Sequence, residues 1–196
     1  MSSPTTETIR WTIADLELFP DDGKRYEIID GELLVTRAPH WRHQKLCVRI
    51  SARLDAWSQE TGLGEAAVTP GIIFSEADNV IPDVVWISNE RLASSLDESG
   101  HLTAAPELVV EVLSQTEKDK KRERASHMLR KRELKLKLYS SQGVREYWIF
   151  DPERREVEIY CRENARLKLT ATLFGNDTLT SQLLPGFSCS VERIFS

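Results

Sequence analysis

The chain has 196 residues, of which 40% are hydrophobic and 29% charged, and its formal net charge is −5. This is the composition of an ordinary globular protein, and no apolar run approaches the roughly 18 residues that span a membrane. The first ten residues lack the apolar core of a secretory signal, and three widely spaced cysteines form no CxxC pair or disulfide framework. We therefore expect a reduced, cytoplasmic setting, a disordered segment over residues 1–9 and a single domain over residues 10–196.

The N-terminal part of the chain predicts a short helix, a hairpin and a long helix. Residues 12–18 form the short helix, with a threonine as its N-cap. Residues 25–36 read as a β-hairpin around Asp30-Gly31, a two-residue turn that favours positive φ. Apolar residues at helical spacing predict a helix over residues 40–59, which Gly62 would end.

The rest of the chain alternates strands with a loop and one long helix. We expect a loop with a helical turn over residues 89–106 and a basic helix over residues 117–141. The predicted strands cover residues 66–74, 80–87, 107–113, 144–150, 156–160, 167–173 and 183–187. Together these elements predict an α/β (α+β) domain with a central mixed sheet flanked by helices.

Two acidic residues stand in otherwise apolar, β-branched segments. Asp83 lies in the segment VIPDVVWI, and Glu111 lies in LVVEVL. Alternation places Glu111 in an apolar layer with Val109, and Asp83 on the same face as Val85. An ionised carboxylate in such a place loses several kcal/mol of hydration unless a cation or hydrogen bonds compensate it. If the two strands are neighbours, the carboxylates converge and can bind Mg²⁺ or Mn²⁺, which prefer oxygen ligands.

Charge is distributed unevenly along the chain. Residues 117–137 contain ten Lys or Arg and four Asp or Glu, a local charge of +6, so the remainder carries −11. An acidic body with one basic segment is compatible with a polyanion contact at one face, and a solvated helix surface is the alternative.

Several blocks, in order and at plausible spacing, resemble the Uma-two family of restriction-endonuclease-like proteins within the PD-(D/E)xK nuclease superfamily. The resemblance extends from about Tyr26 to Phe195, and the blocks are residues 26–33, 82–83, 109–114, 135–139 and 143–152. It implies a restriction-endonuclease-like core with a divalent metal, DNA as the substrate, and a homodimer if both strands are cut.

The resemblance also implies roles for individual residues. Asp83 corresponds to the superfamily aspartate and Glu111 to the acidic residue of the second half-motif, so these two and the Val112 carbonyl would hold the metal. Leu113 stands where the superfamily motif has lysine. The family resembles nucleases whose lysine has moved to the following helix, which favours Lys135.

Four further positions follow from the same resemblance. Lys137 is the second choice for the helix lysine, and Lys131 stands where family members commonly carry aspartate. Glu27 and His43 match positions typical of the family, and His43 would reach the site as a proton carrier or water ligand. The alternatives are that Glu27 faces solvent on the hairpin and that His43 is a surface or capping residue.

Three hypotheses about function remain open at this point. The first is a Mg²⁺-dependent DNA endonuclease, and the second is a catalytically silent module that keeps the nuclease fold for nucleic-acid binding or dimerisation. The third is a metal-independent hydrolase that uses the two carboxylates as acid and base, which the lack of adjacent aromatic residues disfavours.

Overall fold

The computed structural model describes residues 9–114 and 121–196. In chain order its elements are α1 (Ile13–Leu16), β1 (Arg25–Ile29), β2 (Glu32–Thr36), α2 (Trp41–Thr61), β3 (Gly64–Val68), β4 (Ile72–Ser75), β5 (Asp78–Val80), β6 (Val84–Ser88), α3 (Asn89–Ser95), β7 (Leu108–Val112), α4 (Lys121–Gln142), β8 (Glu146–Asp151), β9 (Glu156–Glu163), β10 (Arg166–Phe174), β11 (Thr178–Thr180), β12 (Ser188–Ser190) and α5 (Val191–Phe195).

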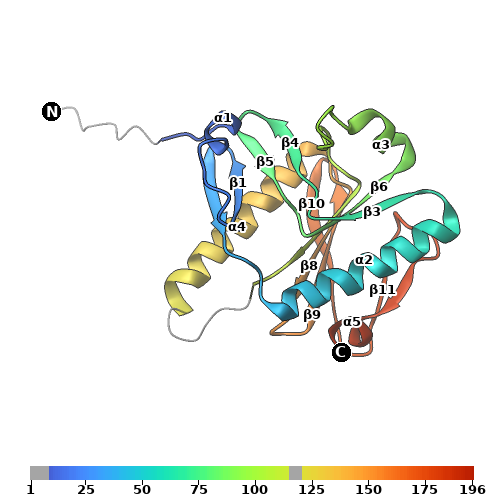
Figure 1. Ribbon diagram of the computed structural model, residues 1–196. Coiled ribbons are helices and arrows are strands. Elements are labelled where there is room, and N and C mark those ends of the chain that lie inside the picture. The colour runs from blue at the N-terminus through green and yellow to red at the C-terminus, as the bar shows by residue number, and fades with distance from the viewer. Residues whose placement is uncertain (1–8, 115–120) are drawn as a thin grey trace.

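A mixed sheet with the strand order β10-β9-β8-β7-β6-β3 forms the centre of the molecule (Figure 1). β7 and β8 run parallel, and α4 makes the crossover between them. The other neighbouring pairs in this sheet are antiparallel. The predicted mixed α/β class, with a central sheet flanked by helices, is confirmed.

Each face of the central sheet packs against its own apolar core. Val110 and its alternating neighbours pack against α2 and the C-terminal segment with α5. Val109, on the opposite side of the same strand, packs against α4 and a second, smaller sheet. β7 is buried along its whole length because both of its faces are covered, which explains its nearly continuous apolar sequence.

The second sheet has the order β2-β1-β5-β4 and lies beside α4 (Figure 1). β1 and β2 form the predicted hairpin, and both Asp30 and Gly31 adopt positive φ in its turn. The helix predicted over residues 40–59 is confirmed as α2, and the His40 side chain caps it by accepting a hydrogen bond from the Arg42 N–H. Gly62 ends it in the left-handed conformation.

Two predictions of a long strand are wrong, because each of these segments contributes one strand to the central sheet and one to the second sheet. The segment predicted over residues 66–74 forms β3 and β4, separated by a turn in which Thr69 has a φ of 50°. The segment predicted over residues 80–87 forms the end of β5 and β6. Pro82 lies between these two strands, and a proline has no N–H to donate to a sheet ladder.

Differences of smaller extent occur elsewhere. The helical turn expected near Arg91 is a seven-residue helix, α3. Residues 183–187 do not form a strand; they connect the β11–β12 pair, while Leu184 and Phe187 are buried in the core. The expected disorder of residues 1–8 and the expected start of the basic helix near residue 117 lie outside the described residues. Among the helices described, none is long and apolar enough to cross a membrane.

Candidate active site

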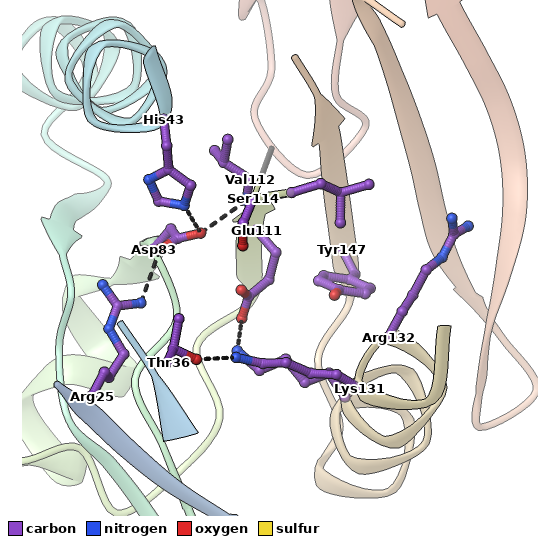
Figure 2. Close-up of a pocket in the computed structure, with 12 residues that line it drawn as sticks. Arg25, Thr36, His43, Asp83, Glu111, Val112, Ser114, Lys131, Arg132 and Tyr147 are labelled. Carbon is purple, nitrogen blue, oxygen red and sulfur yellow. Dashed lines mark hydrogen bonds and ion pairs between the residues drawn. The ribbon is translucent and has the colours of Figure 1, made fainter. Parts of the chain in front are cut away.

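Asp83 and Glu111 converge in a pocket of about 80 Å³ at the ends of β6 and β7 (Figure 2). The two strands are antiparallel neighbours, with Val84 opposite Val110. The hairpin contributes Arg25, α2 contributes His43, and α4 closes the other side with Lys131 and Lys135. The pocket therefore takes its polar side chains from both sheets and from both long helices.

The sequence placed Asp83 inside a strand, but in the structure this residue directly precedes β6. The register places Pro82 opposite Val112, and because proline has no N–H, the ladder stops there. The Val112 N–H instead donates to Asp83 Oδ2 at 2.9 Å. Since the N–H and C=O groups of one strand residue point to the same side, the Val112 carbonyl also points to the side of β7 on which Asp83 lies.

The carboxylate of Asp83 is buried, and two side chains contact it. Arg25 donates from Nη1 to Oδ1 at 2.9 Å, and His43 Nε2 lies 3.2 Å from Oδ2 (Figure 2). Burial alone would raise the pKa of Asp83, but the hydrogen bond and charge of His43 and the Val112 N–H lower it below its usual range. Asp83 is therefore a carboxylate at neutral pH. His43 is buried at 6% exposure, which excludes the alternative of a surface histidine.

Glu111 points from β7 toward α4. Its Oε1 accepts hydrogen bonds from Lys135 Nζ at 2.6 Å and from the Tyr139 hydroxyl at 3.0 Å. Burial raises the pKa of Glu111, and the carboxylates of Asp83 and Glu27 raise it further, against the opposing charge of Lys135. A divalent cation beside Glu111 would relieve this repulsion.

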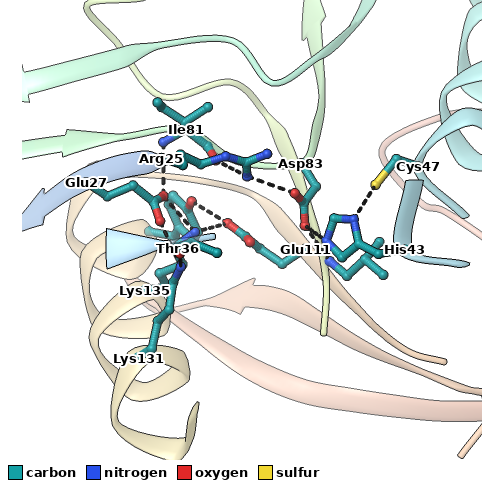
Figure 3. A network of polar contacts seen from close by, with 12 residues as sticks. Arg25, Glu27, Thr36, His43, Cys47, Ile81, Asp83, Glu111, Lys131 and Lys135 are labelled. Carbon is teal, nitrogen blue, oxygen red and sulfur yellow. Dashed lines mark hydrogen bonds and ion pairs between the residues drawn. The ribbon is translucent and has the colours of Figure 1, made fainter. Parts of the chain in front are cut away.

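Glu27 lies at the centre of β1 and is completely buried. It accepts from the Ile81 N–H at 3.0 Å, pairs with Lys135 Nζ at 2.9 Å, and accepts from Lys131 Nζ at 2.8 Å (Figure 3). Burial opposes its charge, but the ammonium groups of Lys135 and Lys131 lower the pKa of Glu27 to about 2. The alternative that Glu27 faces solvent is excluded.

Of the two helix lysines considered from the sequence, the structure brings Lys135 to the acids and leaves Lys137 exposed. Lys135 is itself enclosed, with 2% of its surface exposed. Burial would lower its pKa, but Glu111 and Glu27 together raise it above its usual value. Lys135 is therefore an ammonium group that can donate hydrogen bonds and cannot accept a proton.

Three cations that line the pocket, Arg25, Lys131 and Arg132, were not assigned to the site from the sequence, where Lys131 was considered only as a departure from the family pattern. Lys131 donates to Glu27 and also to the Thr36 hydroxyl, at 2.9 Å. Arg25 lies two residues before Glu27, so strand alternation puts both on one face of the hairpin. That spacing is the signal that could have identified Arg25 once Glu27 was assigned to the site.

The side chains present fit a hard divalent cation. Within the described residues, the polar contacts of Glu111 use Oε1, so Oε2 is available to an ion. Asp83 and the Val112 carbonyl supply further oxygen donors, as Mg²⁺ and Mn²⁺ prefer. The pocket volume accommodates an ion with several waters.

A second possible ligand group, formed by His43, Cys47 and Asp83, fits an ion poorly. Their donor atoms lie within 4.8 Å of one another. However, Cys47 Sγ faces His43 Nδ1 at 3.6 Å, whereas Asp83 contacts Nε2, so the imidazole ring separates the thiol from the carboxylate. Burial also raises the pKa of Cys47 to about 12, which disfavours the thiolate that binds zinc.

Comparison with known proteins places these observations in context. The model of the Uma2 (Uma-two) family, described as "Putative restriction endonuclease", matches residues 13–192. Among solved structures, the fold is similar to that of a "putative nuclease belonging to DUF820" from Anabaena variabilis ATCC 29413, with a TM-score of 0.70 and 15% identity. The match covers 94% of this chain and 97% of that chain, and at this identity it concerns the fold alone. A search of curated proteins gave no match.

Proposed function

Because the chain belongs to the Uma2 family, we propose that it is a divalent-metal-dependent endonuclease that hydrolyses phosphodiester bonds in DNA. The family description, "Putative restriction endonuclease", supports this class of reaction. The observation that carries the finer proposal is the convergence of Asp83 and Glu111 with Lys135, whose Nζ lies 2.6 Å from Glu111 Oε1. Two carboxylates and a fixed ammonium group suit hydrolysis of a phosphodiester, in which negative charge develops on oxygen.

In this proposal Asp83, Glu111 and the Val112 carbonyl hold Mg²⁺ or Mn²⁺. The ion, when bound, polarises a phosphoryl oxygen and lowers the pKa of a water molecule. The oxygen of a water molecule would form the new bond to phosphorus and release its proton to solvent, while the bond to one bridging sugar oxygen breaks and that oxygen takes up a proton from a solvent water.

The protein side chains have separate tasks in the proposal. Lys135 orients the attacking water and stabilises developing negative charge, because its raised pKa keeps it a hydrogen-bond donor. Glu27 positions Lys135 through their 2.9 Å contact. His43 and the Val112 N–H hold the orientation of Asp83.

DNA is the proposed substrate because partly exposed cations line the pocket beside the acids. Arg25, Lys131 and Arg132 have side-chain exposures of 20%, 24% and 27%. Cations at this depth can contact a phosphate backbone while their stems stay packed. Cleavage of both DNA strands would further require two sites, for which a homodimer is the simplest arrangement.

The test is nicking of supercoiled DNA with Mg²⁺ or Mn²⁺ by the wild-type protein and by Asp83→Asn and Glu111→Gln. We expect each variant to lose roughly a hundredfold or more in rate, because a metal-binding oxygen is removed while side-chain shape is kept. Glu107→Gln is the matched control: Glu107 is equally buried but pairs with Ser88 and Arg91 at the far end of β7. Equal residual nicking by the wild type and Asp83→Asn would contradict the proposal.

A second candidate function is a catalytically silent module that binds nucleic acid or dimerises. It is favoured by the ion pairs that already neutralise the acids, since Arg25 contacts Asp83 and Lys135 contacts Glu111. Calorimetry with Mn²⁺ separates the two candidates. A silent module would show no Mn²⁺ binding that depends on Asp83, whereas the nuclease would show binding that Asp83→Asn abolishes.

A further inference from the structure

Arg25 holds the oxygen of Asp83 that a metal ion would have to take. Oδ2 already accepts from the Val112 N–H and contacts His43 Nε2. Arg25 Nη1 donates to the other oxygen, Oδ1, at 2.9 Å (Figures 2 and 3). An ion that binds Asp83 from the pocket therefore meets a guanidinium group at the less occupied oxygen.

The guanidinium of Arg25 is able to leave this position. Its second anchor is a single backbone acceptor, the Ile81 carbonyl at 3.1 Å, and its side chain is 20% exposed on the pocket wall. The Lys135 ammonium, by contrast, is enclosed between Glu27 and Glu111. Of the two cations that contact the proposed metal-binding acids Asp83 and Glu111, Arg25 is thus the one with open space beside it.

The charges around the acids favour displacement of Arg25 when a divalent ion binds. Among the described residues, three carboxylates (Glu27, Asp83, Glu111) are in contact with three cations (Arg25, Lys131, Lys135). A fourth cation of the pocket wall, Arg132, pairs with Glu158 instead. A divalent ion at the acids adds two positive charges, which favours the departure of a mobile cation and the arrival of an anion. A phosphate group is such an anion, and the planar fork of an arginine matches it.

We propose that Arg25 is a substrate-binding residue that occupies Asp83 in the metal-free protein and binds a phosphate of the DNA once a divalent ion has taken Asp83. This inference rests on the proposed function, because it uses the same acids and the same substrate. It adds that Arg25 weakens metal binding in the absence of DNA and strengthens DNA binding in the presence of metal.

The experiment measures these two opposite effects in Arg25→Gln. In calorimetry without DNA, we expect the variant to bind Mn²⁺ roughly tenfold more tightly than the wild type, since no charged hydrogen bond must be broken. With a labelled DNA duplex and Ca²⁺ in place of Mg²⁺, we expect roughly tenfold weaker DNA binding and a salt slope smaller by about one. In EDTA the DNA affinities should be equal, because Arg25 is then held by Asp83.

Arg91→Gln is the matched control. Arg91 also joins a backbone carbonyl, that of Ala105 at 2.7 Å, to a buried carboxylate, that of Glu107 at 3.2 Å. It lies outside the pocket, so it should change neither the Mn²⁺ nor the DNA affinity. Arg25→Lys is a second variant for the case that Arg25→Gln melts at a much lower temperature. Both effects should keep their sign in Arg25→Lys and be smaller, because lysine keeps the charge without the fork.

The outcomes separate this inference from the proposed function. If Asp83→Asn abolishes Mn²⁺ binding while Arg25→Gln binds Mn²⁺ no more tightly than the wild type, the role of Arg25 is overturned and the metal site stands. If Asp83→Asn binds Mn²⁺ like the wild type, the proposed function and the inference both fail. An equal loss of DNA affinity in Ca²⁺ and in EDTA would also overturn the inference, because Arg25 would then bind DNA without release from Asp83.

Discussion

Replacement of Glu27 by glutamine should destabilise the protein by ~3 kcal/mol. The carboxylate is completely buried and faces the ammonium groups of Lys135 and Lys131 at 2.9 and 2.8 Å. These contacts lower the pKa of Glu27 from 4.5 to about 2, a difference that corresponds to ~3 kcal/mol of folding free energy at neutral pH. Glutamine keeps the shape and the acceptor for the Ile81 N–H but leaves two ammonium groups less well compensated.

The assay is urea unfolding at pH 7, with Glu32→Gln as the matched control. Glu32 also joins the hairpin to α4, through Arg130 Nη2 at 2.7 Å, but this pair lies at the surface. An exposed ion pair contributes only about 0–1 kcal/mol, so Glu32→Gln should leave the unfolding midpoint nearly unchanged. The two variants thus compare one buried and one exposed ion pair between the same two elements.

The pH dependence gives an independent measure of the same interaction. Because the pKa of Glu27 is lower in the folded chain than in the unfolded chain, its stabilisation is complete above about pH 4.5 and is lost as the pH falls toward 2. The difference in free energy of unfolding between the wild type and Glu27→Gln should therefore shrink across this window. A Glu27→Gln variant no less stable than Glu32→Gln, or a difference that does not change between pH 5 and pH 2, would refute the reasoning.

Two further predictions concern packing and thiol chemistry. Gly64→Ala should cost roughly 2–4 kcal/mol, because the new methyl group would overlap the Ile87 carbonyl oxygen, which is backbone and cannot move aside. Gly71→Ala should cost less than about 1 kcal/mol in the same urea experiment, because its methyl group would meet only the half-exposed side chain of His101. Cys47 should not react with a thiol reagent in the native protein at pH 8, since burial raises its pKa to about 12. Cys47→Ser should therefore lower the thiol count by one in denaturant and leave the native count unchanged.

Short sequence patterns were sufficient to predict the features that depend on residues close together in the chain. Asp30-Gly31 predicted the hairpin turn, and the apolar spacing with Gly62 predicted α2 and its end. Alternation predicted that Glu111 points into the layer that also contains Val109, as the structure shows. Each of these inferences depends on residues close together in the chain.

Contacts between distant segments could not be predicted in the same way. The stretch around Pro82 reads as one apolar strand, yet it leaves one sheet and enters another, because the proline interrupts the ladder opposite Val112. The burial of Glu27 depends on two lysines about a hundred residues away. From the sequence alone, a solvent-exposed Glu27 was as compatible with the hairpin as a buried one, because hydrophobic periodicity does not show which helix covers a hairpin.

The division of the pocket between two sheets has a consequence for truncation and engineering. The central sheet shares no strand with the second sheet, so the β1–β2 hairpin contributes no hydrogen bond to the ladders of the central sheet. The hairpin nevertheless supplies Arg25 and Glu27 to the pocket. A fragment cut back to the central sheet and its long helices could keep its backbone pairing and still lose the charge balance around Asp83 and Glu111. The shortest fragment that can form the central sheet is therefore smaller than the shortest fragment that can form the complete pocket.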